Sequence, residues 1–356
     1  MPIVVNSNTT ATTASFNLSH ANDALRKSLA RLSSGNRIVN PADDAGGMAV
    51  AYKLNSKLKR TEAVRHNVQN GLSYLQVQDG ALSTVAKIAD RMAELRTMAS
   101  DVTKNTGDVE NYSKEFIELQ RQLNQIRHEK FNGISLFATS TSSETSSPPE
   151  LRPALYKQGL TLDDSGRGYA KFAREILTTS DGVRQDGHVS LNVVNMQYLL
   201  SIGQVDTRFI STASAATITA GQTAESATGR NVYINLGNVD NGNMDDADAA
   251  TRSEIYTSDG YLSSVLFVSM ASFVDVIERI ADARAENAAE QNRLSVTNNL
   301  LMQNQTNLEA AHGRIMDADV ALESTRFARQ NVLVQSSAAM VAQANQLTSI
   351  ALTVLG

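Results

Sequence analysis

Hydrophobic residues recur every seven positions near both ends of the chain, the spacing of helices that pack in coiled coils. The N-terminal set is Leu18, Leu25 and Leu32. The C-terminal sets are Leu294, Leu301, Leu308, Ile315 and Leu322, followed by Leu333, Met340, Leu347 and Val354. Many residues between them are Ala or Ser, which bury little apolar area. Because a lone helix of this kind is marginal in water, the pattern predicts that each helix packs against a partner.

Residues that break helices are rare in these regions. The prolines are Pro2, Pro41, Pro148, Pro149 and Pro153. After Gly260, the only glycines are Gly313 and Gly356, so the last part of the chain is predicted to be long helix. We expect the first helix at about residues 17–33 and the last at about 318–354.

Capping residues predict where the first helix ends and the second begins. Gly35 is placed to end the first helix, since glycine is the usual residue just beyond a helix C-terminus. Asn40 is suited to cap the second helix, and Pro41 to fill its first position. Asp43 and Asp44 would then lie in the first turn, where the helix dipole favours negative charge.

Further signals organise the segment that follows. The second helix is expected to reach about Thr103, with interruptions at Gly71 and Gly80. A turn and cap at 105–108 predicts the start of a third helix. Asn132-Gly133, which comes after that helix, is a signal for a β-hairpin.

The character of the sequence changes after a polar linker at 139–149. Alternating polar and apolar residues predict strands at Val189–Tyr198 and Asn231–Val239, and a helix is expected at about Gly168–Thr179. The predicted fold is therefore mainly α, with long antiparallel helical coiled-coil arms formed by both termini and a small inserted α+β outer domain.

Composition excludes several classes of protein. The 356 residues include no Cys, which excludes disulfides and thiol chemistry, and the formal net charge of -5 argues against general nucleic-acid binding. The N-terminus lacks the features of a Sec signal peptide, and no apolar stretch is long enough to span a membrane. Residues 1–60 carry net positive charge and 270–356 net negative charge, which suits either contact between the ends or scatter on solvated faces.

No candidate for catalysis stands out. Asp43 and Asp44 are better explained by a helix start than by paired catalytic carboxylates. The acidic run 238–248 offers oxygen ligands for Ca²⁺ but departs from the EF-hand pattern, so a solvated turn is the simpler interpretation. His188 and His312 stand alone, and no nucleotide-binding or hydrolase motif is present. We expect no enzyme activity, no cofactor and no metal site.

Two hypotheses remain on these grounds. One is a self-assembling structural protein, in which other copies of the chain cover the apolar repeats of the terminal helices. The other is a soluble monomer with a helical stalk and a binding or enzymatic head at 150–262. Two terminal helices paired only with each other would leave much of their apolar faces in water, so further partners are expected.

Several motifs resemble those of bacterial flagellins. The sequences ARLSSGNRI at 30–38 and NPADDAGG at 40–47 resemble the N-terminal segment of that family. The C-terminal motifs are GRIMDAD at 313–319 and AQANQ at 342–346. Asn70-Gly71 and Phe131-Asn-Gly133 also match, so the resemblance covers about 15–137 and 263–356.

The resemblance implies a filament subunit for swimming motility, whose termini are disordered in the monomer and form coiled coils on assembly. It implies an inner core at 1–40 and 314–356, a helical shell at 41–138 and 263–313, and a variable outer domain at 139–262. The residues expected in the polymerisation core are Leu18, Leu25, Leu32, Leu333, Met340 and Leu347.

The resemblance also implies partners and a location. The partners are other copies of the chain, an export chaperone, the filament cap and hook-associated proteins, with no nucleic acid and no membrane insertion. The location is the extracellular flagellar filament, reached through the flagellar type III apparatus without a cleaved signal. Hook–filament junction proteins share similar helical ends and are the alternative within the family.

Flagellins of some bacteria are recognised by a vertebrate Toll-like receptor through the shell helices. The residues that match this motif are Arg91, Glu94, Leu95 and Glu118. Ala93 stands where an Arg is common, and the segment before Phe131 is shorter than in enteric flagellins. The resemblance therefore predicts either a receptor contact or a role for Arg91 and Leu95 in subunit packing alone.

Overall fold

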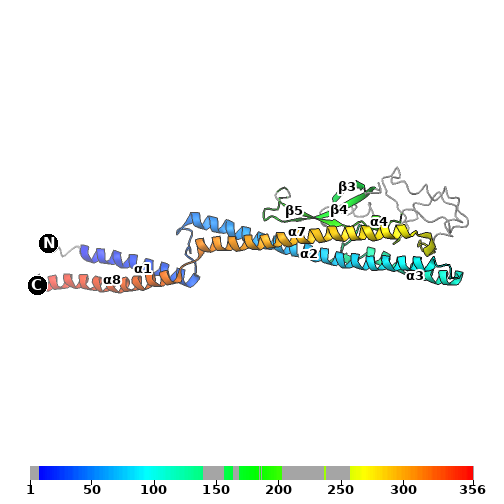
Figure 1. Cartoon of the computed structure of the whole chain (residues 1–356). Helices are drawn as coiled ribbons and strands as arrows, with labels where there is room; N and C mark the ends of the chain where they lie inside the picture. The colour runs from blue at the N-terminus through cyan, green and yellow to red at the C-terminus, as the bar shows by residue number, and fades with distance from the viewer. Residues whose placement is uncertain are drawn as a thin grey trace. The chain divides into compact units, whose positions relative to one another are not determined.

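The computed structural model describes residues 8–138, 156–162, 168–183, 185, 187–202, 236–237 and 257–355, and the side chains of all of these except 156–162, 168–170 and 347–355. Long helices account for most of the described chain, and Figure 1 shows their order. They are α1 (Thr9–Ser34), α2 (Ala45–Ala99), α3 (Thr106–Arg127), α7 (Met270–Met316) and α8 (Val320–Leu355). The prediction of a mainly α fold is confirmed.

The chain divides into two compact units. One comprises Met1–Glu62 and Met302–Gly356, and the other comprises Ala63–Leu301. The division falls within α2 and within α7. Each unit therefore contains segments from both halves of the sequence.

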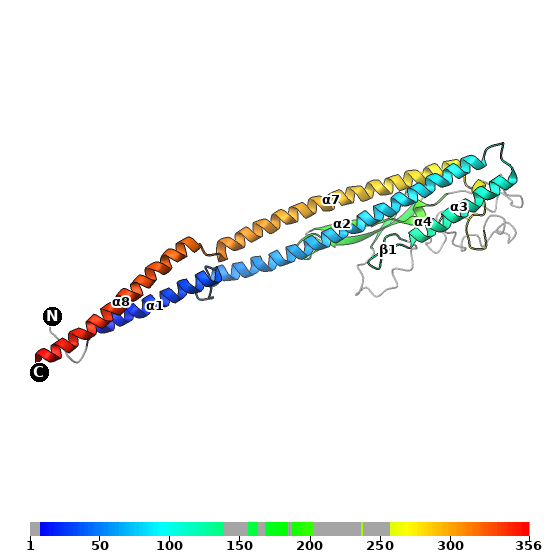
Figure 2. The same cartoon turned by 90° about the horizontal axis from the view of Figure 1, so that it is seen from below.

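In the first unit α1 and α8 pack side by side along their lengths (Figures 1 and 2). The Asn8 side chain bonds the Ala344 carbonyl, and Ser28 bonds Glu323. Residues early in α1 thus meet residues late in α8, so the two helices are antiparallel, as predicted. Helix α1 starts at Thr9, several residues before the predicted start, and Asn8 caps it by accepting the Ala11 N–H.

The predicted end of the first helix is confirmed, but the predicted start of the second is wrong. Gly35 has the left-handed φ of 71° that favours glycine, and its N–H bonds Arg31 O. Helix α2 begins at Ala45, where Asp44 caps it by accepting the Gly47 N–H. Asn40 instead accepts the Asp43 N–H through its carbonyl in a turn. Asn and Asp residues favour turns as well as helix caps, and here Asn40 begins a turn instead of capping the helix.

Helix α2 runs without interruption through Gly71 and Gly80, which corrects the predicted breaks. Gly71 is used for close approach, because a Cβ there would clash with Cδ1 of Ile176. Asn105 caps α3 in a capping box with Asp108, as the turn signal predicted.

The second unit carries the strands. The predicted Asn-Gly hairpin is confirmed as β1 (Lys130–Phe131) and β2 (Ile134–Ser135), with φ values of 49° at Asn132 and 78° at Gly133. A three-stranded antiparallel sheet has the order β3 (Tyr156–Leu162), β4 (Gly168–Leu177), β5 (His188–Val193).

Strand β4 corrects the helix predicted at Gly168–Thr179. The segment is rich in residues that favour helices, but β4 is the middle strand and pairs with both β3 and β5. Pairing on both edges outweighs weak local preference. The strand predicted at Val189–Tyr198 is confirmed as far as Val193, after which α4 (Met196–Leu199) begins. Of the strand predicted at Asn231–Val239, only Leu236 and Gly237 lie within the described residues.

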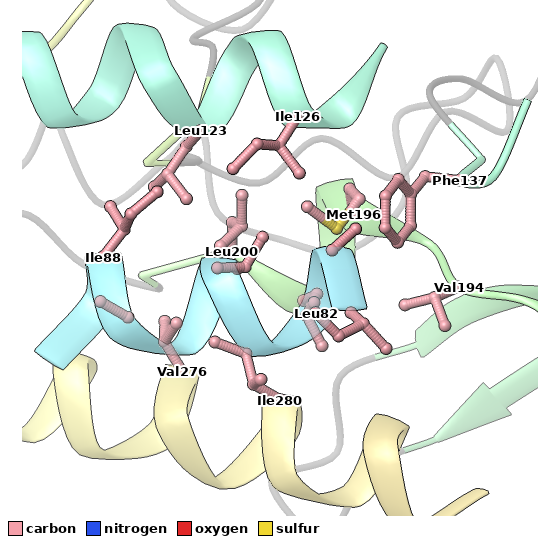
Figure 3. Packing of buried hydrophobic residues seen from close by; sticks show 14 of the residues in the cluster. Leu82, Ile88, Leu123, Ile126, Phe137, Val194, Met196, Leu200, Val276 and Ile280 are labelled. Carbon is pink, nitrogen blue, oxygen red and sulfur yellow. The ribbon is translucent and has the colours of Figure 1, made fainter. Parts of the chain in front are cut away.

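The core of the second unit lies where α2, α3, α4, α7 and β5 meet. Figure 3 shows side chains from the four helices pointing toward one another, among them Leu82, Leu123, Met196 and Ile280. Phe116 of α3 and Phe273 of α7 are fully buried and make an edge-to-face pair 6.4 Å apart. This core joins the helices to the sheet region.

Candidate interaction surfaces

The α1–α8 interface follows a three-then-four spacing on both helices, as in a coiled coil. The α1 residues that are buried or half-buried along this line are Ala11, Ala14, Leu18, Ala21, Leu25, Ser28 and Leu32. Their counterparts on α8 are Glu323, Phe327, Gln330, Val334, Ser337, Val341 and Ala344. Among the described side chains of the two helices, those that are fully buried are small or polar: Ala21, Ser28, Glu323 and Ala344. The pair therefore buries little apolar area of its own.

A polar cluster within this interface fixes how the two helices align. The Ser28 hydroxyl donates to Glu323 Oε1 at 2.7 Å, and this bond is buried. Arg31 and Arg326 bring their guanidinium groups to 3.9 Å and 3.4 Å from Glu323 Oε2. A buried carboxylate that loses such partners is costly, so polar groups in a coiled-coil interface favour one register.

The structure distributes the six predicted polymerisation residues over two surfaces. Leu18, Leu25 and Leu32 are half-buried in the α1–α8 interface. Leu333 and Met340 are 45% and 62% exposed and lie beside the line of α8 that faces α1. The backbone of Leu347 is helical, but its side chain is outside the described residues.

Helix α8 thus carries two apolar repeats one residue apart. Val334 and Val341 face α1, whereas Leu333 and Met340 do not. Leu322 is also exposed and lies on the same side as these two, since the spacings of eleven and seven residues return to one helix face. We call Leu322, Leu333 and Met340 the α8 stripe.

The connections between helices in the first unit are held by backbone bonds. The Arg37 N–H donates to Met316 O at 2.6 Å, and the Ala318 N–H donates to Gly35 O at 2.9 Å. Lys27 pairs with Asp43 at 2.7 Å, and this hydrogen bond is the main reason that the pKa of Asp43 is lowered. Asp43 and Asp44 thus have structural partners, but both precede α2 rather than lying in its first turn: Asp44 caps the helix and Asp43 belongs to the turn before it.

A second exposed surface surrounds Arg91 on α2. Its Nε donates to Glu115 Oε1 of α3 at 2.8 Å, and its Nη1 donates to Glu94 Oε2 at 2.9 Å. These two carboxylates raise the pKa of Arg91, with Glu115 the larger cause. Arg91, Glu94 and Glu115 are all exposed, so the cluster is accessible to a partner.

The other two predicted receptor residues lie in different surroundings. Leu95 is 0% exposed and belongs to the core of the second unit. Glu118 is exposed on α3 and pairs with Arg121, which also bonds Asp259 at 2.9 Å. The structure therefore brings Arg91 and Glu94 together, while Leu95 supports them from beneath. Glu115 is a member of the cluster that the sequence motif did not single out.

The described residues contain no group of three or more His, Asp or Glu side chains that could hold a metal ion. The acidic run 238–248 lies outside the described residues. None of the helices among the described residues is both long and apolar enough to cross a membrane.

One functional contact was not predicted from the sequence: a polar joint between the sheet and the two long helices. Gln78 of α2 is fully buried; its amide donates to Leu136 O at 2.9 Å and to Asn192 O at 3.2 Å. Asn287 of α7 donates to Gln78 Oε1 at 3.0 Å. Glu290, one turn further along α7, accepts the Asn192 N–H with both oxygens. A polar residue inside an apolar helix stripe is the signal that could have identified Gln78 and Asn287.

Two family models match the chain. The bacterial flagellin N-terminal helical region matches residues 5–142, and the bacterial flagellin C-terminal helical region matches residues 272–354. The matched segments include every helix that forms the interaction surfaces above.

Relatives of similar length cover nearly the whole chain. The flagellar filament 33 kDa core protein of Treponema phagedenis is 26% identical over 99% of this chain and 100% of its own length. The flagellin of Bacillus subtilis is 27% identical over 96% of both chains. A solved structure described as a putative flagellar hook-associated protein from Vibrio parahaemolyticus is 13% identical, covers 77% of this chain and 100% of its own, and has a TM-score of 0.47.

Proposed function

This chain belongs to the bacterial flagellin family and is a structural subunit of the flagellar filament that drives swimming, and we propose that its copies polymerise through the α1–α8 pair. The observation that carries this proposal is the exposed α8 stripe. Leu333 and Met340 lie beside an interface that buries mostly small side chains. Apolar area left uncovered on a weakly packed helix pair is the expected surface for further copies.

The same features support a disorder-to-order transition of the termini on assembly. Few fully buried apolar side chains hold α1 against α8, so the pair gains little free energy to offset its ordering entropy. Contacts with other copies would bury the apolar area that the α1–α8 pair leaves exposed. In this proposal 1–40 and 314–356 form the inner core, 41–138 and 263–313 the helical shell, and 139–262 a variable outer domain that projects from the filament.

The proposed role is structural rather than catalytic, and it entails further partners. An export chaperone would hold the disordered termini before secretion through the flagellar type III apparatus, without a cleaved signal. The filament cap and hook-associated proteins would meet the same terminal helices at the two ends of the filament. The mature location in this proposal is outside the cell.

Assembly of the purified chain tests the proposal. We expect seeded protein at neutral pH, or protein salted out with sulfate, to form uniform hollow filaments in electron microscopy. Far-UV circular dichroism should show a gain in helix in the same sample, because α1 and α8 fold on assembly. Persistent monomers with unchanged helix content would instead favour terminal helices that pair within one chain, as in a junction protein or a helical stalk.

We further propose that the cluster of Arg91, Glu94 and Glu115 is the contact for a vertebrate Toll-like receptor, with Glu118 nearby on α3. The exposure of these groups supports the proposal, in which the buried Leu95 packs beneath them and does not contact the receptor.

A reporter-cell assay with monomeric protein tests this contact. We expect a response from the wild-type chain and a loss of at least about tenfold in potency for Arg91→Ala, which removes a charged group worth about 1.4 kcal/mol or more. Lys87→Ala, on an exposed neighbouring turn of α2, is the matched control and should signal normally. Silence of the wild-type monomer at doses where an enteric flagellin signals would refute the contact.

A further inference from the structure

The contact between α7 and the edge of the sheet holds a half-buried carboxylate against the backbone of a strand. Strand β5 is at the end of the sheet, and its Asn192 N–H is directed to α7 rather than to β4. Glu290 accepts that N–H with both carboxylate oxygens, at 3.0 Å and 2.9 Å. The strand edge is thereby closed by a side chain of α7, which takes the place of a further strand.

Charged groups from two neighbouring elements surround this carboxylate. On α7, Glu286 and Arg293 lie one turn to either side of Glu290. From β4, Lys171 pairs with Glu286 at 2.7 Å, and Glu286 also accepts the Asn192 side-chain amide. Arg293 donates to the His188 carbonyl at the start of β5. Glu290 itself has no cation directly bonded to it in the described contacts, so its charge is only partly compensated.

We propose that Glu290 makes the attachment of the β5 edge to α7 sensitive to pH, so that the attachment is strong in mildly acidic medium and weakens as the medium becomes neutral to alkaline. In this contact the Glu290 carboxyl group lies against the edge of β5. The cations near it, Lys171 and Arg293, are bonded to Glu286 and to the His188 carbonyl. Ionising it in place costs free energy that is recovered if the strand edge moves away and water reaches the carboxylate.

The direction follows from proton linkage. Burial is the largest cause of the raised pKa of Glu290, about 7, while the Asn192 N–H, Arg293 and Lys171 act in the opposite direction. A detached Glu290 would titrate near the ordinary value of 4.5. The attached state therefore holds more protons between these values. Its stabilisation is complete below pH 4.5 and is lost as the pH rises through 7.

Hydrogen exchange of the β5 amides in the monomeric full chain measures the attachment. After correction for intrinsic exchange, we expect protection of the Asn192 amide, whose N–H bonds Glu290, to fall about 20-fold between pH 5.5 and 7.5 and then to level off. Glu290→Gln keeps an acceptor oxygen but carries no charge, so its protection should not change with pH. Glu309→Gln, an exposed glutamate on the same helix, should behave like the wild type.

A second measurement needs no variant to fold. The side-chain carboxyl carbon of Glu290, followed by NMR in the wild-type chain, should titrate with a midpoint near 7. A midpoint near 4.5, or the same pH-dependent loss of protection in Glu290→Gln as in the wild type, would overturn the proposal. The proposal about Glu290 does not depend on filament formation, since it concerns contacts within one chain.

Discussion

Replacing Met340 by Asp should abolish filament formation and leave the unit Ala63–Leu301 folded. Met340 is 62% exposed in the single chain, so the new carboxylate is hydrated and costs the monomer little. In the proposed filament the α8 stripe is covered by other copies, and the carboxylate would be buried without a partner.

The expected size of this effect follows from the cost of that burial. Several kcal/mol would be lost at a contact that every subunit repeats. Since 1.4 kcal/mol is a factor of ten, the concentration needed for assembly should rise by about 100-fold or more. Sedimentation and electron microscopy of seeded protein measure this, and the thermal unfolding of the second unit shows whether that unit is intact.

Met340→Leu is the matched control. It keeps an apolar side chain of similar volume, so filaments should form at nearly the wild-type concentration. Filaments of normal length from Met340→Asp would mean that the α8 stripe stays in water after assembly. Polymerisation would then have to use a different surface.

Helix α8 shows what the seven-residue repeats predict and what they do not. The seven-residue repeats predicted that α1 and α8 are helices that pack on one another, and this is confirmed. They did not identify which of the two repeats on α8 faces α1. Val334 and Leu333 belong to parallel lines of similar composition, so the choice depends on the partner surface and on the bond between Ser28 and Glu323. Which line of α8 packs on α1 depends on both helices, so the sequence of α8 alone does not determine it.

The sheet region was less predictable for a related reason. Gly168–Thr179 contains good helix formers, and its strand conformation depends on pairing with β3 and β5. The motif predicted two of the three residues of the Arg91 cluster, Arg91 and Glu94, but not Glu115, which comes from another helix. The polar joint was missed because its partners include backbone carbonyls of Leu136 and Asn192, which no side-chain motif reveals.

Gln78→Leu should remove the centre of this joint and destabilise the second unit. The substitution has nearly the same size, but it deletes the donor to Leu136 O and Asn192 O and the acceptor for Asn287 Nδ2. Gln78 and Asn287 are buried where α2 and α7 meet, and Asn192 of β5 is half-buried beside them, so water replaces the lost bonds only in part. Leu136 O still accepts the Tyr74 hydroxyl, and Asn287 Nδ2 still donates to Leu75 O, so Asn192 O is the group that loses most. A buried polar group left without a partner costs about 1–3 kcal/mol, so a loss of about 1–3 kcal/mol in the free energy of unfolding is expected.

Urea unfolding followed by circular dichroism measures this loss, and Gln122→Leu provides the comparison. Gln122 is an exposed glutamine on α3, so the same chemical change there should alter stability by less than about 0.5 kcal/mol. If the two variants unfold at the same urea concentration, the hydrogen bonds of Gln78 add no net stability over an apolar side chain. A selective loss in Gln78→Leu would instead mean that the helices hold the sheet chiefly by hydrogen bonds to its backbone. The side chains of the outer region could then change without weakening the attachment of the sheet to the helices. The bonds of Gln78 are made to backbone carbonyl groups, which every residue carries.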